Sequence, residues 1–297
     1  MPNALNYAQA YAQALAQAYP YVLHFAALRS TENDSRYRWI NANTIQIPSL
    51  STTGRVDADR DTIGTAKRNF ENAWEPKILT NHRKWSTLVH PMDIDETNQV
   101  ASIQNITRVF NEEQKFPEMD AYMVSKIHSD WKTAGGTDDE TVLTTENILP
   151  AFDGWMEAMD EANVPKTGRI LYVTPAVKTL LKNAREINRF IQNGDPAIRR
   201  AVASLDEVQI EDVPSALMKT AYDFTEGWKA GAGAQQINMM LVHPSAVITP
   251  EKYTFAQLDP PSAGSEGKWV YFEESYDDVF ILNKRVAAIR FNITKGA

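Results

Sequence analysis

Cysteine is absent from the 297 residues of this chain. Without a thiol, the protein cannot form a disulfide, use a cysteine nucleophile or hold zinc through cysteine. Long apolar runs are missing too, and a membrane-spanning helix would need about 18 consecutive apolar residues. Basic residues are the minority, with 30 Lys and Arg against 38 Asp and Glu and a formal net charge of −8. This balance argues against a protein that binds nucleic acid by neutralising its phosphates.

Charge is also absent from the first 28 positions, which contain no Asp, Glu, Lys or Arg. A secretory signal would need a basic start and a continuous apolar stretch, whereas glutamine interrupts this segment every four residues. A repeat of the letters YAQA places larger side chains on one stripe of an expected helix, which Pro20 ends or kinks. The stripe consists of Tyr7, Tyr11, Leu15 and Tyr19. Either this helix packs on its own domain, or the segment is an arm that lies against a neighbouring subunit.

Motifs for catalysis are scarce. Asp57, Asp59 and Asp61 imitate the opening of a calcium-binding loop. Thr62 stands where that loop needs glycine, and Arg68 stands where it needs a bidentate glutamate. The glycine-rich segment at residues 231–236 and the five histidines show no cofactor or metal-ligand spacing. We therefore predict no catalytic, cofactor-binding or metal-binding residue.

Two extended segments are expected in the N-terminal third. Residues 36–47 alternate as a strand that Pro48 ends, and residues 77–90 form the second strand. Residues 49–64 between them are small, polar and charged, with two glycines, which is typical of an exposed tip. Neither strand has a clean apolar face, and a two-stranded ribbon is marginally stable alone in water. We therefore expect the ribbon to lie on another surface.

A long helix is expected over residues 93–133, because apolar side chains recur there with helical spacing. Pro117 falls inside this pattern and predicts a kink or a restart of the helix. Gly135 and Gly136 are expected to end it. A helical region of about forty residues is more typical of a structural spine than of a compact enzyme.

The rest of the chain is expected to be mixed α/β. Helices are predicted for residues 148–159 and from Pro175 onward, where proline suits a first helical position. The predicted strands are residues 169–174, 208–213, 237–242, 269–272, 279–282 and 287–293. Residues 237–242 are apolar on both faces, as in a central strand, and the last three strands are expected to form an antiparallel meander.

Four segments carry a resemblance to a known family. They are MDIDETN (residues 92–98), Q-x-x-P-E-x-D-A-Y (residues 114–122), GRILYVTPAVKTLL (residues 168–181) and YDDVFILNKRVAAI (residues 276–289). In wording and order, together with the neutral N-terminal segment and the long excursion, they resemble the major capsid proteins of tailed phages. That family has the HK-ninety-seven-type (Johnson) fold, and the resemblance covers nearly the whole chain.

The resemblance implies an α+β fold with five parts. Residues 1–28 would be the N-terminal arm, 29–91 the E-loop region with its extended β-hairpin, and 92–140 the spine helix of the peripheral domain. Residues 141–250 would be the mixed α/β axial domain, and residues 251–297 would complete the peripheral domain with the C-terminal β-meander.

The resemblance also implies a structural protein rather than an enzyme, one that self-assembles into an icosahedral phage head around double-stranded DNA. Its partners would be copies of itself in hexamers and pentamers, scaffolding and portal proteins, and DNA bound without sequence specificity. It would need no cofactor and touch no membrane, and it would be assembled in the host cytoplasm and located in the virion.

Residues of the arm and the ribbon are the expected contacts between subunits, because a thin subunit would need neighbours to bury them. The candidates are Tyr7, Tyr11, Leu15, Tyr19, Trp39, Ile45, Ile47, Gly54, Arg55, Asp57 and Trp85. Two alternatives stay open at this point, an encapsulin-like cellular compartment with the same fold and a soluble α/β enzyme.

Overall fold

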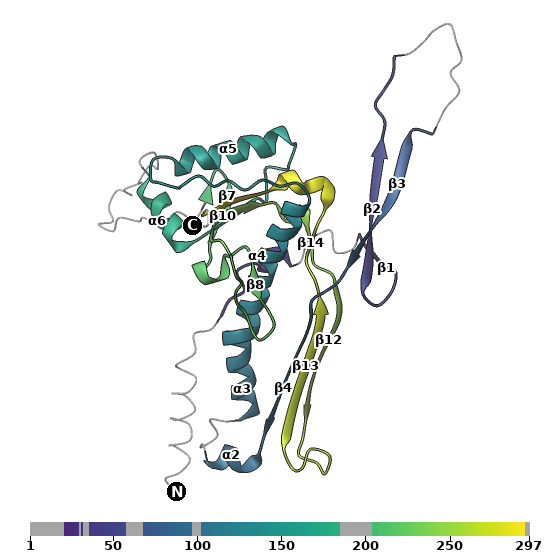
Figure 1. Ribbon diagram of the computed structural model, residues 1–297, viewed down its shortest axis with the longest axis vertical. Coiled ribbons are helices and arrows are strands. Elements are labelled where there is room, and N and C mark those ends of the chain that lie inside the picture. The colour runs from purple at the N-terminus through teal and green to yellow at the C-terminus, as the bar shows by residue number, and fades with distance from the viewer. Residues whose placement is uncertain are drawn as a thin grey trace, which may run out of the picture.

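The computed structural model describes residues 21–29, 31, 36–57, 68–96, 102–184 and 204–294 of the chain. The molecule is elongated, and a two-stranded ribbon projects from a body of helices and sheets (Figure 1). The expected stripe at residues 7–19 and the end of the expected tip at residues 58–64 lie outside the described residues. Predictions about those two segments therefore stay predictions.

A five-stranded sheet forms the centre of the body. Its strands follow the order β15 (Ile289–Ile293), β10 (Ile237–Val242), β5 (Ile170–Val173), β7 (Val208–Asp212) and β6 (Ser204–Leu205). β5 and β7 run parallel, and the other neighbours are antiparallel. Five of the six residues of β10 are buried, which confirms the predicted central strand.

Helices cover both faces of this sheet. Leu171 of β5 packs on one face with residues of α5 (Ile148–Glu161) and α6 (Pro175–Asn183). Its neighbour Tyr172 points to the other face and packs in the cluster that includes residues of α4 (Phe116–Thr133). The predicted helices over residues 148–159 and from Pro175 are both confirmed.

A long helical run crosses the body (Figure 1). It consists of α3 (Ile103–Phe110), a π-helical turn η3 (Asn111–Lys115) and α4. The expected restart at Pro117 is confirmed, because α4 begins at Phe116 with the proline in its first turn, directly after this π turn. Proline has no N–H for the helical ladder, and a π turn shifts the hydrogen-bond pattern by one residue. The helix can therefore continue past the proline.

The long helix begins later than expected but ends where it was expected to end. Ser102 has an extended backbone, so α2 (Pro91–Glu96) is a separate short helix and the long helix does not begin at Asp93. At the other end, Gly135 has φ of 95°, and Gly136 donates its N–H to the carbonyl of Trp131 at 2.9 Å. This left-handed C-terminal cap confirms the predicted end.

A three-stranded antiparallel sheet lies alongside the long helix (Figure 1). Its strands follow the order β12 (Glu251–Asp259), β13 (Trp269–Asp277) and β4 (His82–Val89). β12 was not expected from the sequence, and β4 was expected to belong to the ribbon. The segment 77–90 is in fact divided between two strands that belong to different sheets.

The expected C-terminal meander is wrong. β13 pairs with β4 and β12, β14 (Phe280–Ile281) pairs with β11 (Val247–Ile248), and β15 pairs with β10. A 3-10 helix, η6 (Asn283–Ala288), replaces the expected short turn between β14 and β15. The remaining short elements are η1 (Ala26–Leu28), η4 (Ser215–Leu217), β8 (Tyr222–Asp223), β9 (Lys229–Ala230) and η5 (Pro244–Ala246).

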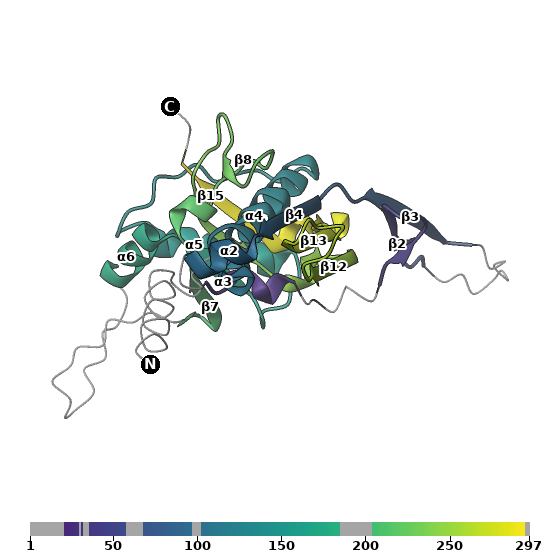
Figure 2. The ribbon, with the colours of Figure 1, turned by 90° about the horizontal axis from the view of Figure 1, so that it is seen from below.

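The projecting ribbon consists of β2 (Thr44–Thr52) and β3 (Phe70–Ile78), which pair over nine residues. Figure 2 shows it from below, extending away from the three-stranded sheet. Pro48 lies inside β2 rather than ending it. β1 (Arg38–Trp39) pairs with β2 only at Ile45 and Gln46. At Pro48 the strand is therefore an edge, where proline is tolerated.

Candidate subunit-contact surfaces

One face of the ribbon is anchored on the body. Ile45 and Ile47 alternate onto this face, and their side chains are only 0% and 6% exposed. They form an apolar cluster with Leu79, Ile248 and Phe280. The expectation that a neighbouring subunit buries Ile45 and Ile47 is therefore wrong, because β11 and β14 of the same chain already cover them.

The opposite face of the ribbon is apolar and exposed. This ribbon apolar face consists of Pro48, Leu50, Phe70, Trp74, Pro76 and Ile78. Leu50 and Ile78 are 61% and 59% exposed, so a single chain leaves most of their apolar surface in water. Two guanidinium groups lie over its aromatic rings, Arg38 at 3.8 Å from the centroid of Trp74 and Arg68 at 4.9 Å from that of Phe70.

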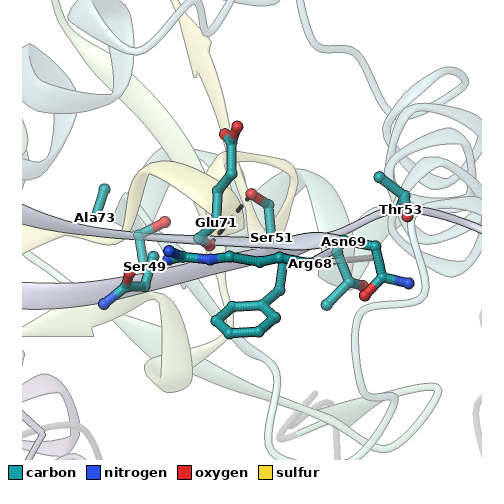
Figure 3. Close-up of a pocket in the computed structure, with 10 residues that line it drawn as sticks. Ser49, Ser51, Thr53, Arg68, Asn69, Glu71 and Ala73 are labelled. Carbon is teal, nitrogen blue, oxygen red and sulfur yellow. Dashed lines mark hydrogen bonds between the residues drawn. The ribbon is translucent and has the colours of Figure 1, made fainter. Parts of the chain in front are cut away.

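A shallow hollow of about 780 Å³ lies near the distal end of the ribbon (Figure 3). Residues of β2 and β3 and the chain next to them line it, including Ser49, Ser51, Asn69 and Glu71. Ser51 Oγ donates a hydrogen bond to the carbonyl of Glu71 at 3.5 Å. The lining is mostly small and polar.

The three-stranded sheet turns one face toward the long helix. Trp85 of β4 stacks on Phe110 of α3, with ring centroids 3.8 Å apart. Lys115 forms an ion pair with Glu273 of β13 at 3.1 Å. Glu273 also accepts a hydrogen bond from the hydroxyl of Tyr271. Burial raises the pKa of Tyr271 to about 12. Trp85, expected at a subunit contact, is therefore half-buried within its own chain.

The other face of this sheet carries apolar side chains that the described chain leaves exposed or half-buried. This uncovered sheet face consists of Leu88, Tyr253, Phe255, Val270 and Phe272. Leu88 is 61% exposed and Tyr253 is 46% exposed. Every residue of the edge strand β12 is exposed. An exposed edge strand with aromatic side chains is typical of a pairing or docking surface.

The other candidates from the sequence fall into three groups. Trp39 is half-buried against the cluster of Ile45, and Lys252 Nζ lies 4.4 Å from its ring centroid. Gly54, Arg55 and Asp57 are exposed beyond the end of β2. Of the predicted ribbon contacts, these three are the exposed ones. Tyr7, Tyr11, Leu15 and Tyr19 lie outside the described residues.

Buried carboxylates tie the first described segment to the body. Asp120 of α4 is fully buried and accepts hydrogen bonds from the Tyr21 hydroxyl at 2.6 Å and the His24 N–H at 2.9 Å. Burial raises the pKa of Asp120, and these two hydrogen bonds oppose the rise. Asp278 is also fully buried and accepts a hydrogen bond from Tyr122 at 2.8 Å. These carboxylates bind donors of the protein itself, which indicates a structural role.

The described residues show little that could support catalysis. Among them, no group of three or more histidine, aspartate or glutamate side chains is placed to hold a metal ion. His128 contacts Asp138 at 2.9 Å, and burial lowers the pKa of this histidine. None of the helices in the described ranges combines the length and apolar character that a membrane crossing requires.

The sequence analysis missed the ribbon apolar face and the uncovered sheet face. A signal for the first was present, because Phe70, Trp74 and Ile78 are spaced by four residues. An even spacing places side chains on one face of a strand. The same spacing fits a helix face, so the sequence could not distinguish the two structures.

Neither the protein-family models nor the curated proteins contain a match to this chain. Solved structures do match. The capsid chain of bacteriophage PhiM1 is 14% identical over 86% of this chain and 83% of its own length, with a TM-score of 0.65. The capsid chain of cyanophage P-SCSP1u is 13% identical over 94% and 90%, also with a TM-score of 0.65.

A third match is the capsid of Myoviridae phage XM1, which is 11% identical over 92% of both chains with a TM-score of 0.55. All three matches extend over most of both chains, so the likeness concerns the whole architecture and not one shared motif. The chain therefore has the mixed α/β fold of phage capsid proteins.

Proposed function

We propose that this chain is the major capsid protein of a tailed phage and self-assembles into an icosahedral shell that encloses double-stranded DNA. The observation that carries the proposal is the likeness to phage capsid chains over 94% of the sequence. The ribbon corresponds to the E-loop of the resemblance, and the helix from Ile103 to Thr133 corresponds to its spine. The domain division, with the axial domain at residues 141–250, is part of the same proposal.

The exposed surfaces support a role in assembly. The ribbon apolar face and the uncovered sheet face both leave large apolar side chains in water. Burying them against another copy would contribute a favourable free energy of about 25 cal/mol per Å² of apolar surface. We assign both faces to contacts between copies, with the ribbon of one copy on the sheet of another. Two different surfaces meet in such a contact, and repetition around a rotation axis closes a ring.

Further contacts come from residues that the sequence alone suggests. The stripe of Tyr7, Tyr11, Leu15 and Tyr19 would lie on a neighbour, and Gly54, Arg55 and Asp57 would extend the ribbon contact. Scaffolding and portal proteins would act during assembly in the host cytoplasm. The net charge of −8 discourages adhesion to the packaged DNA, which suits a container.

Sedimentation and electron microscopy of the purified full chain test the proposal. We expect rings or closed shells, and a compact monomer at high concentration would contradict it. Native particles should contain DNA, whereas an enzyme cargo in its place would indicate an encapsulin-like compartment.

Three aspartate substitutions test the contact surfaces. Leu50 and Leu88 are each 61% exposed, on the ribbon apolar face and the uncovered sheet face. Leu50→Asp and Leu88→Asp should leave the melting of dissociated subunits unchanged and reduce the yield of shells. Val142 is 79% exposed outside both faces, so Val142→Asp is the matched control and should assemble normally. Equal yields from all three variants would contradict the assignment of the two faces.

A further inference from the structure

The 3-10 helix η6 holds the ribbon through two polar side chains. The amide of Asn283 lies between two residues of β3: its Nδ2 donates to Glu75 Oε2 at 2.7 Å, and its Oδ1 accepts from Lys77 Nζ at 3.2 Å. Lys284 Nζ donates to the backbone carbonyl of Leu50 in β2. Two adjacent residues of η6 therefore hold both strands of the ribbon.

The bonds of Asn283 lie level with the apolar anchor, because Lys77 and Glu75 pair with Ile45 and Ile47, and only the bond of Lys284 reaches further along the ribbon. The buried cluster holds β2 as far as Ile47, whereas Lys284 holds it at Leu50. A cavity of about 190 Å³ remains between the ribbon and η6, lined by residues such as Ile47, Ile248 and Leu282. Close packing is incomplete at this cavity, so the hydrogen bonds of Asn283 and Lys284 supply direct contacts between the ribbon and η6 beside it.

The same short helix is fixed firmly to the rest of the molecule. Arg285 donates to the carbonyl of Ser245 at 2.7 Å, and the carbonyl of Val286 accepts from the buried indole of Trp131 at 3.2 Å. η6 also leads directly into β15 of the central sheet. The ribbon is thus held by a support that is itself attached to the long helix and the central sheet.

We propose that Asn283 and Lys284 are positioning residues that set the direction of the ribbon and, through it, the angle between neighbouring subunits. The step from ribbon direction to subunit angle rests on the proposed shell function. The step from these two residues to ribbon direction does not, because it concerns contacts within one subunit.

Spin-label distances in dissociated subunits test the first step. The chain has no cysteine, so Asn72→Cys on the ribbon and Glu157→Cys on α5 would be the only two labelled positions. We expect a narrow distance distribution without further change and a broader or shifted one after Asn283→Ala with Lys284→Ala. Lys229→Ala removes an exposed lysine from β9 and is the matched control, which should leave the distribution unchanged.

Electron microscopy of the assembled particles tests the second step. The variant with both alanines should form particles of altered or uneven diameter, while its subunits melt as the unaltered protein does. An unchanged distance distribution would overturn the positioning role, whether or not the chain assembles. A changed distribution with unaltered particle diameters would overturn the link to subunit angle. Failure of the unaltered chain to assemble would count against the shell function and leave the distance result valid.

Discussion

The indole ring of Trp85 lies flat on the ring of Phe110, with centroids 3.8 Å apart and an angle of 6° between the planes. Trp85 belongs to β4 of the three-stranded sheet, and Phe110 is the last residue of α3. The stack therefore fastens the sheet to the long helix. It also removes most of the surface that Trp85 could offer to a neighbouring subunit.

Replacing Trp85 with alanine should weaken the subunit itself. Trp85→Ala removes the stack and part of a buried surface, and we expect the free energy of unfolding to fall by about 2 kcal/mol. Urea unfolding of dissociated subunits measures this change. A value equal to that of the unaltered protein would show that the stack contributes nothing to the fold.

Trp74 is the matched tryptophan, because it lies on the ribbon apolar face and is 39% exposed. Trp74→Ala removes the contact with Arg38 and should lower the free energy of unfolding by about 1 kcal/mol, less than Trp85→Ala does. Its effect should appear in assembly, as a lower yield of shells. The two substitutions therefore distinguish a tryptophan that mainly stabilises the fold from one that mainly contacts a neighbouring subunit.

Elements with a strong internal pattern could be predicted from the sequence. The apolar run of β10 and the alternation of Ile289, Phe291 and Ile293 in β15 each indicate a strand without further information. The pairing of these two strands could not be predicted, because alternation fixes which face is apolar and not which strand lies beside it. The expected meander was wrong for this reason.

The contact surfaces could be predicted only in part for a related reason. Ile45 and Ile47 look like half-buried strand residues, but their partners Ile248 and Phe280 lie about two hundred positions further along the chain. The sequence shows that the ribbon has apolar side chains on both faces. Only the folded chain shows which of these two faces its own body covers.

Replacing Arg169, in the connection between α5 and β5, should strongly lower the free energy of unfolding. Its side chain is fully buried, and it donates hydrogen bonds to Asp160 at 2.6 Å and to the carbonyls of Val164 and Pro165 at 2.7 and 2.9 Å. Arg169→Ala leaves the two backbone carbonyls without this donor and Asp160 with Lys166 alone, and we expect a loss of about 3 kcal/mol in the free energy of unfolding. Urea unfolding of dissociated subunits measures it.

Lys166 provides the control for Arg169, because it pairs with the same carboxylate at 2.8 Å while its side chain is 75% exposed. Lys166→Ala should cost no more than about 0.5 kcal/mol, as exposed ion pairs contribute little. Equal losses from both substitutions would show that burial of the arginine is unimportant.

Two glycines should respond to alanine in opposite directions. A Cβ at Gly136 would lie 2.2 Å from Cδ2 of the fully buried Trp131, so Gly136→Ala should lower the free energy of unfolding by about 2 kcal/mol. A Cβ at Gly154 in α5 would meet no atom within 4 Å, so Gly154→Ala should raise it by about 1 kcal/mol. Thermal melting of both variants checks the signs, and two shifts in the same direction would contradict the explanation.

The stability of the subunit should depend on pH through Asp277. Burial raises the pKa of Asp277 above its ordinary value of 3.8, and the neighbouring Asp278 adds to the rise while Arg29 opposes it. A raised pKa in the folded state means that the contribution of this group to stability is complete below 3.8 and is lost as pH rises through the folded-state value. Asp277→Asn keeps the side chain neutral, so it should stabilise the subunit at pH 7 relative to the unaltered protein, and this gain should shrink as the pH approaches 3.8.

Asp223 is the control with the opposite sign, because its hydrogen bonds from Thr225 lower its pKa. Asp223→Asn should destabilise the subunit at pH 7, with a cost that shrinks on acidification, and urea unfolding between pH 7 and pH 4 compares the two. A stability loss at pH 7 from Asp277→Asn would show that the ion pair with Arg29 outweighs the burial of the carboxylate.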